Sequence, residues 1–199
     1  MAAPVGLDRD QVVDAGVAVL EEQGRLDAVS LAEVAGRLGI RTQSLYAHVE
    51  GIDGLRRALA LRGLAALGEE LTAEAIGRAG SDAVEAIARA YYAFAIEHPG
   101  LYDASLRPPG DDPELRHAMA TVTRPLNVVF GSYGLDEAAA VHWYRVVFAG
   151  VHGFATLQRD GLLTMPGDPE ESLGRMIDAF VHQIEVEVRA RGGRRSGRR

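Results

Sequence analysis

Residues 30–49 read SLAEVAGRLGIRTQSLYAHV, and they contain the signals of a short helix followed by a tight turn. Ser30 and, three residues later, Glu33 form a capping-box pattern, in which each side chain accepts a hydrogen bond from the other residue's backbone N–H. Leucine, valine and alanine then recur at helical spacing, so one face of this helix would be buried. Gly39 ends the helix, because glycine readily adopts the positive φ that a sharp helix end requires.

A second short helix is expected directly after this turn. Thr42 is placed to cap it, and Leu45 and Val49 lie four residues apart, so both would face inward. The residues left on the outer face are Gln43, Ser44, Tyr46, Ala47 and His48. Two short helices joined by a glycine-containing turn are typical of a helix-turn-helix, whose second helix fits the major groove of DNA.

The outward side chains have the chemistry that DNA recognition uses. Gln43 can form two hydrogen bonds with adenine, serine and threonine hydroxyls can donate to bases or phosphates, and the Ala47 methyl can contact a thymine methyl. The alternative is a helical hairpin whose polar residues are simply solvated. Because both caps and the glycine turn occur together in one short stretch, the pattern favours DNA binding.

The same region resembles the TetR (tetracycline-repressor-like) family of transcriptional regulators over residues 7–62. The motifs that carry the resemblance are Leu31-x-x-Val34-Ala35-x-x-Leu38-Gly39-Ile40, Leu45-Tyr46-x-His48-Val49 and Leu55. The resemblance implies base-facing positions for Thr42, Gln43 and Ala47. It implies phosphate-facing positions for Ser30, Ser44, Tyr46 and His48.

One position departs from the family pattern. Four residues after His48 the family usually has a lysine that contacts a phosphate, whereas this chain has Ile52. The missing cation would have to be replaced by Arg41, Arg56 or Arg57.

Composition and charge limit the function classes. The chain has 199 residues, no cysteine and a net charge of −7, so thiolate metal sites and cysteine nucleophiles are excluded. Neither a secretory signal nor a long apolar run is visible, so we expect a cytoplasmic protein without a membrane partner. Residues 1–62 carry 7 arginines and 9 acidic residues, whereas residues 63–188 carry 8 and 19, so the negative charge lies mainly outside the predicted DNA-binding region.

Caps and apolar spacing predict an all-α protein, with an N-terminal three-helix helix-turn-helix unit and a larger helical bundle for ligand binding and dimerisation. We assign residues 1–52 to a DNA-binding domain and 53–190 to an effector-binding and dimerisation domain. Residues 191–199 are rich in Arg and Gly and are expected to form a disordered tail.

Several helix boundaries follow from local signals. Asp8-x-x-Gln11 predicts the start of the first helix, and Gly24 predicts its end. Asp112, followed by a proline, predicts a cap for a later helix, in which Pro125 predicts a kink or break.

The last two long helices, expected from residue 135 to about 159 and from residue 168 onward, have wide apolar faces. Such faces suggest a four-helix interface between two copies of the chain. A symmetric dimer would present two helix-turn-helix units to a palindromic site on double-stranded DNA. The alternative is that both helices are ordinary core of one chain.

Part of this C-terminal region resembles a TetR subclass named for a Trp-His-Gly motif. The resemblance rests on residues 148–157 and on the His-Pro-Gly-Leu-Tyr stretch at 98–102. Here Val151, rather than tryptophan, precedes His152, and the tryptophan of this chain is Trp143.

No spacing in the sequence supports a metal, a cofactor or catalysis. Glu114-x-x-His117 matches half of a di-iron helix motif, but the second half is missing. Neither a phosphate-binding glycine loop nor a GxSxG motif occurs, so we predict neither catalytic residues nor cofactors and do not expect an enzyme.

Aromatic residues and methionines spread over the later helices predict an effector pocket, because such side chains often line cavities between bundle helices. The predicted pocket residues are Tyr91, Phe94, Tyr102, Met119, Phe130, Trp143, Phe148, His152 and Met176. The alternative for each of them is plain core.

Together these observations predict a dimeric transcriptional repressor that a small apolar or aromatic effector releases from its operator. Two rival functions remain open at this point. One is a helical ligand carrier with a vestigial DNA-binding unit, which the near-neutral N-terminal charge and Ile52 would favour. The other is a small helical enzyme, for which no catalytic spacing exists.

Overall fold

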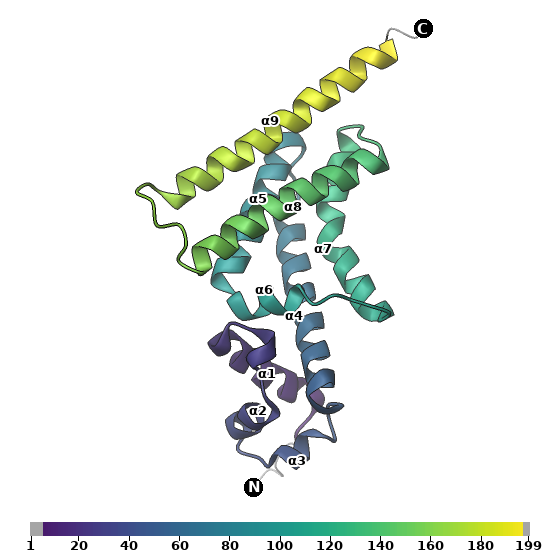
Figure 1. Cartoon of the computed structure of the whole chain (residues 1–199). Helices are drawn as coiled ribbons and strands as arrows, with labels where there is room; N and C mark the ends of the chain where they lie inside the picture. The colour runs from purple at the N-terminus through teal and green to yellow at the C-terminus, as the bar shows by residue number, and fades with distance from the viewer. Residues whose placement is uncertain (1–5, 197–199) are drawn as a thin grey trace. The chain divides into compact units, whose positions relative to one another are not determined.

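The computed structural model describes residues 6–196 and confirms an all-α protein, with no strand among these residues. The helices are α1 (Arg9–Gln23), α2 (Leu31–Leu38), α3 (Thr42–Leu45), α4 (Gly51–Ala75), α5 (Gly80–Glu97), α6 (Pro99–Ser105), α7 (Pro113–Ser132), α8 (Glu137–Arg159) and α9 (Pro169–Ser196), with a 3₁₀ turn at Leu26–Ala28 (Figure 1). None of the described helices is long and apolar enough to span a membrane.

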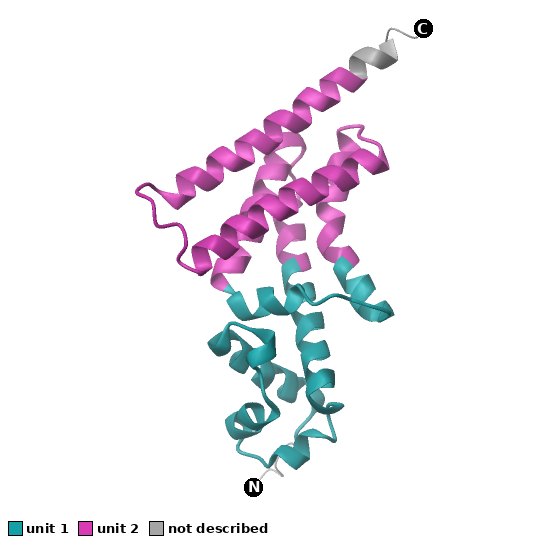
Figure 2. Cartoon of the chain, viewed as in Figure 1, with its two compact units in different colours: residues 1–67, 98–119 teal, residues 68–97, 120–199 magenta. Residues whose placement is uncertain are grey.

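The chain divides into two compact units (Figure 2). Unit 1 contains the described residues up to 67 together with 98–119, and unit 2 contains 68–97 together with those from 120 onward. Helices α4 and α7 therefore each contribute residues to both units. The boundary expected between residues 52 and 53 lies at the start of α4, whereas the compact units divide that helix after residue 67.

The first helix of unit 1 begins and ends as predicted. The Gln11 N–H donates to Asp8 Oδ1 (2.8 Å), and the Asp8 N–H donates to Gln11 Oε1 (3.0 Å). Gly24 ends the helix with φ of +69°. In its middle, Gly16 allows α1 to lie against Leu55 and Leu59 of α4.

Unit 1 also contains α6, which lies far along the chain from the N-terminal helices. The backbone N–H groups of Gly100 (3.2 Å) and Leu101 (3.0 Å) donate to the Glu21 carboxylate of α1. The Leu26 N–H donates to Asp103 Oδ2 at 2.7 Å. Gly100 lies so close to the Leu20 backbone of α1 that a Cβ atom there would clash with it. These contacts fix α6 to the N-terminal helices.

Unit 2 is a helical bundle in which α5 packs against α8 and α9, and α8 packs against α9. The side of α8 that faces the bundle is buried, as at Val147 and Val151. Its other side is not buried within one chain, since Val146 is 45% exposed and Leu157 is 43% exposed. One copy of the chain therefore covers only part of the wide apolar face expected on α8.

The structure bears on two expectations about helix continuity. The break expected as one alternative near Arg124 does not occur, because helix α7 continues through Pro125, which is buried. Helix α9 extends to Ser196 and so includes the first residues of the expected tail, whereas residues 197–199 lie outside the described residues. Ion pairs between residues four apart stabilise the end of α9. Those of the described part join Arg189 to Glu185 (2.8 Å) and Arg191 to Glu187 (2.7 Å).

Candidate nucleic-acid interface

Helix α2 has the predicted capping box. The Glu33 N–H donates to Ser30 Oγ (3.3 Å), and the Ser30 N–H donates to Glu33 Oε2 (3.2 Å). Gly39 then takes a positive φ of +67°, and the Ile40 N–H donates back to the Ala35 carbonyl at 3.0 Å. This pattern is the hydrogen-bonded reversal that ends a helix and turns the chain sharply.

Helix α3 differs from the prediction at its start and in its length. Arg41, not Thr42, is the N-cap residue, and no side chain caps the helix. The regular helix ends at Leu45, and residues 46–48 continue as turns, with the His48 N–H donating to the Leu45 carbonyl (2.9 Å). Leu45 is fully buried and Val49 is 5% exposed, so the predicted inward residues are confirmed.

The outer surface of α3 and the following turn carries polar side chains that are not engaged elsewhere. We call this surface the reading ridge, and its residues are Arg41, Thr42, Gln43, Ser44, Tyr46, Ala47 and His48. Thr42 and His48 are half-buried and the others are exposed. The Tyr46 side chain is 61% exposed, so both its ring and its hydroxyl can be reached from solvent. Among the described residues, no side-chain hydrogen bond or ion pair occupies the ridge, so its donors are available.

Ser30, the remaining residue expected to face a phosphate, is not available in the same way. Its hydroxyl donates to Glu33 Oε2 at 2.7 Å. A hydroxyl has only one hydrogen to donate. Ser30 could donate to a phosphate only after releasing Glu33, whose carboxylate would itself repel the phosphate.

The arginines of unit 1 are mostly paired within the unit. Arg56 donates to the Asp27 carbonyl at 2.6 Å, and Arg37 pairs with Glu22 at 2.6 Å. Of the three arginines considered as replacements for the lysine missing at position 52, Arg41 alone is exposed and without a partner among the described residues.

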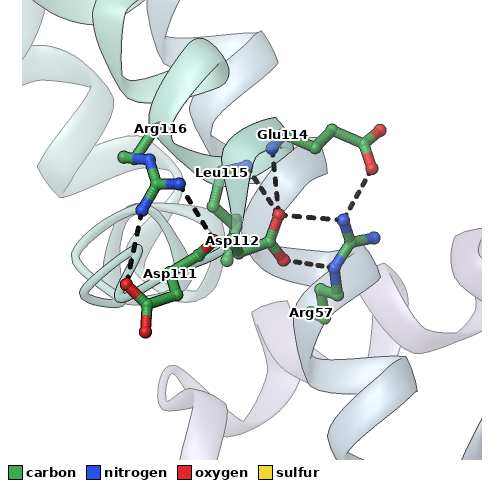
Figure 3. A network of polar contacts seen from close by, with 6 residues as sticks. All are labelled: Arg57, Asp111, Asp112, Glu114, Leu115 and Arg116. Carbon is green, nitrogen blue, oxygen red and sulfur yellow. Dashed lines mark hydrogen bonds and ion pairs between the residues drawn. The ribbon is translucent and has the colours of Figure 1, made fainter.

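Arg57 joins α4 to the start of α7 (Figure 3). Its guanidinium donates through Nε and Nη2 to the two carboxylate oxygens of Asp112, and Nη2 also donates to Glu114 Oε2 at 2.6 Å. Asp112 caps α7 as predicted, because Oδ1 accepts from the N–H groups of Glu114 (3.0 Å) and Leu115 (3.2 Å). The Arg57 guanidinium lowers the pKa of the Asp112 carboxyl to about 2. We call Arg57, Asp112 and Glu114 the α4–α7 clasp.

The residues predicted to line an effector pocket are divided between the units. Tyr102, on α6, and Met119, on α7, belong to unit 1, where Tyr102 is fully buried. The seven in unit 2 are Tyr91, Phe94, Phe130, Trp143, Phe148, His152 and Met176. Trp143 is used elsewhere, since its Nε1–H donates to Glu187 Oε2 of α9 at 2.8 Å.

Unit 2 contains an apolar cavity of about 20 Å³. Its lining residues are Leu71, Ile87, Ala88, Tyr91, Val122, Leu126, Tyr144, Val147, Phe148 and Val151. Only Tyr91 and Phe148 belong to the predicted pocket set. The space is about that of one water molecule, whereas a drug-sized ligand needs roughly 300 Å³ or more. A ligand could enter only if the surrounding helices moved apart.

Tyr144 is a pocket residue that the sequence prediction missed. Its ring stacks on Phe148 with centroids 5.6 Å apart, and Phe148 stacks in turn on His152 at 5.9 Å. The spacing of four residues along α8 could have revealed this row of rings. Burial raises the pKa of Tyr144 to about 12, still further above pH 7 than the usual value for tyrosine, and the neutral phenol can act as a donor.

Comparisons with known proteins agree with this geometry. A family model described as "Tetracyclin repressor-like, C-terminal domain" matches residues 84–180. An uncharacterized HTH-type transcriptional regulator of Mycobacterium tuberculosis is 35% identical over 165 residues, which cover 82% of this chain and 75% of that protein. The chain belongs to the TetR family. TetR-family regulators are helix-turn-helix proteins that bind DNA and control transcription, and they are not enzymes.

Two further proteins place this TetR-family regulator among its relatives. An uncharacterized HTH-type transcriptional regulator of Bacillus subtilis is 30% identical over 186 residues, covering 94% of this chain and 97% of that protein. The crystal structure of a TetR variant from Acinetobacter baumannii in complex with minocycline has a TM-score of 0.66 at 20% identity, covering 90% of this chain and 97% of that one. The resemblance to the Trp-His-Gly subclass is not confirmed.

Proposed function

We propose that two copies of this TetR-family regulator bind a palindromic operator in the cytoplasm, repress transcription there, and are released by a small apolar or aromatic effector. The observation that carries the DNA-binding part is the reading ridge. It places hydrogen-bond donors, a methyl group and one arginine on an exposed turn, and none of these side chains is used by the described residues. These free donors and the methyl group match the hydrogen-bonding groups and thymine methyls that base pairs present in the major groove.

Within the ridge we assign two kinds of role. Thr42, Gln43 and Ala47 contact bases, and Ser44, Tyr46, His48 and Arg41 hold phosphates. Since the other arginines near the ridge are paired within unit 1, few cations remain for the DNA backbone. Binding should therefore depend only moderately on salt, because the salt dependence scales with the number of phosphates neutralised.

Gel-shift titration with DNA from around its own gene tests these roles. Replacing Tyr46 by alanine is expected to weaken binding about tenfold on every DNA sequence, whereas replacing Gln43 by alanine should relax the preference at one base pair by about 1–3 kcal/mol. Tyr46→Phe is the matched control for Tyr46→Ala, because it removes the phenol hydroxyl and keeps the aromatic ring. If both alanine variants changed affinity alike and left sequence preference intact, the assigned roles would be wrong.

The dimer that we propose forms through an exposed stripe of small and apolar residues that also includes two histidines. Its members lie three or four residues apart on each helix: His142, Val146, Ala149, Gly153 and Leu157 on α8, and Ala179, His182, Val186 and Ala190 on α9. All are exposed or half-exposed in one chain. Because α8 and α9 pack side by side within unit 2, two copies of this pair can form a four-helix interface.

The proposed effector would enlarge the apolar cavity of unit 2. None of the residues that line it is charged, so we expect an uncharged ligand, with the hydroxyls of Tyr91 and Tyr144 as its polar contacts. The structurally similar TetR variant binds minocycline, which shows that the fold can hold an aromatic ligand. A thermal-shift screen with neutral aromatic and aliphatic compounds should find ligands that raise the melting temperature by several degrees and release DNA. A compound class that stabilises the protein without releasing DNA would contradict the repressor model.

A further inference from the structure

Arg56, near the start of α4, is bonded to the backbone just ahead of α2. Its Nη2 donates to the Asp27 carbonyl at 2.6 Å and to the Val29 carbonyl at 3.4 Å, and Ser30, the N-cap residue of α2, follows directly. Arg56 and Asp27 lie 29 residues apart in the chain. These bonds therefore close a loop of chain that contains α2, the turn at Gly39, α3 and the whole reading ridge.

The reading ridge is attached to the rest of unit 1 on two sides. Ahead of it, α2 packs against α3, and behind it, α4 begins at Gly51, shortly after His48. Among the described residues, Arg56 makes the side-chain hydrogen bonds that join α4 to the segment 26–50. Because these bonds hold the two attachments to each other, the ridge cannot pivot on either one without breaking them.

The way Arg56 is placed differs from that of a solvated surface arginine. Its Nε is buried and has no hydrogen-bond partner among the described residues, which is an unfavourable state for a charged group. The nearby Asp27 carboxylate pairs with Arg25 at 2.7 Å, so Arg56 bonds to backbone carbonyls instead. A bond to a carbonyl fixes the path of the main chain, whereas a bond to an exposed carboxylate fixes only a mobile side chain.

We propose that Arg56 is a positioning residue through which the reading ridge distinguishes its operator from other DNA, and that it does not contact DNA itself. This inference rests on the proposed operator binding. Base edges are read by hydrogen bonds of narrow distance and angle, whereas contacts to phosphates carry no sequence information. A ridge that is free to pivot therefore loses its base contacts and keeps most of its attraction to the DNA backbone.

Replacing Arg56 by methionine tests this role, because methionine keeps an unbranched apolar stem and removes every donor. The core around it, with Val34, Leu45 and Leu55 fully buried, is unchanged, so unit 1 should stay folded. Gel shifts would compare a duplex from around its own gene that the wild type binds with a scrambled duplex of equal length and composition. Affinity for the first should fall about tenfold, the worth of roughly one charge-assisted hydrogen bond. Affinity for the scrambled duplex should change by less than about twofold.

Arg62→Met is the matched control. Arg62 also lies on α4 and pairs within unit 1, with Asp14 at 3.1 Å, but this exposed pair lies outside the closed loop. Both affinities should change by less than about twofold in this variant, since exposed ion pairs contribute little. Arg56→Lys should regain most of the lost preference, because its ammonium group can donate to one of the two carbonyls.

Two other roles for Arg56 give different results. Loss of folded protein alone would lower both affinities by the same factor. A phosphate contact would lower both and would reduce the slope of log affinity against log salt by about 1, as Arg41→Ala should. Either result, or an Arg56→Met protein with the wild-type preference, would overturn the proposal. A wild-type protein that bound both duplexes alike would instead refute the proposed operator binding.

Discussion

Replacing Val146 by glutamate is expected to make the protein monomeric and to weaken operator binding by about 100-fold or more. Val146 lies in the middle of the α8 stripe and is 45% exposed in the single chain, so the substitution leaves unit 2 folded. In the dimer it would bury an unpaired carboxylate in the interface, which is strongly unfavourable. A monomer offers one reading ridge at a time and loses the gain of roughly 100-fold or more that linking two half-site contacts provides.

Val128→Glu is the control for this experiment, because it makes the same chemical change at an exposed valine of unit 2 that lies on α7, away from the stripe. Molar mass measured by light scattering should fall by half for Val146→Glu and stay unchanged for Val128→Glu. Operator affinity should likewise fall for Val146→Glu and stay unchanged for Val128→Glu. A Val146→Glu protein that remained dimeric would place the interface elsewhere and would remove the proposed α8–α9 dimer.

Replacing Gly100 by alanine is expected to destabilise unit 1 by about 3 kcal/mol, a cost at the upper end for overpacking. A Cβ atom at this position would overlap the Leu20 carbonyl and the Glu21 N–H of α1, and all of these atoms belong to backbone that cannot rotate away. Relief requires α6 to separate from α1. That movement would also lengthen the hydrogen bonds from the start of α6 to the Glu21 carboxylate. Urea unfolding followed by circular dichroism measures the loss.

Gly36→Ala provides the opposite result in the same unit. Gly36 lies inside α2 with no atom within 4 Å of an added Cβ, so alanine gains helix propensity without a clash. The expected change is a stabilisation of up to about 1 kcal/mol. If Gly100→Ala proved as harmless as Gly36→Ala, the close contact between α6 and α1 would not exist in solution, and α6 would not move with the DNA-binding helices.

Local hydrogen bonding made much of unit 1 predictable. The capping boxes at Asp8 and Ser30 and the reversal at Gly39 involve partners within a few residues, so a one-dimensional pattern contains all the information they need. The failures are also local in origin. Thr42 was expected to cap α3, but Ser and Thr side chains compete with several backbone arrangements, and Arg41 takes the cap position with no side-chain bond.

The prediction of pocket residues from aromatic and methionine content shows a limit of composition, which does not say which side chains line a cavity. Aromatic and methionine content predicted a pocket among the later helices, yet the cavity of unit 2 is lined mainly by aliphatic residues such as Leu71 and Val122, and Tyr102 lies in the other unit. Which residues face a void depends on how helices pack, and packing joins residues that are far apart in the chain. No periodicity within one helix contains that information.

The sequence by itself determined the all-α fold, the helix-turn-helix and the outward residues of the reading ridge, because each depends on spacing within one or two helical turns. The tertiary structure alone decided which charged side chains remain for DNA. Arg41, Arg56 and Arg57 look equivalent in the sequence, but Arg57 meets Asp112 fifty-five residues away and Arg56 meets the Asp27 carbonyl. An arginine can bind a DNA phosphate only if it is not already bonded to a nearby carboxylate or carbonyl. Which of these groups lie near it depends on the folded structure.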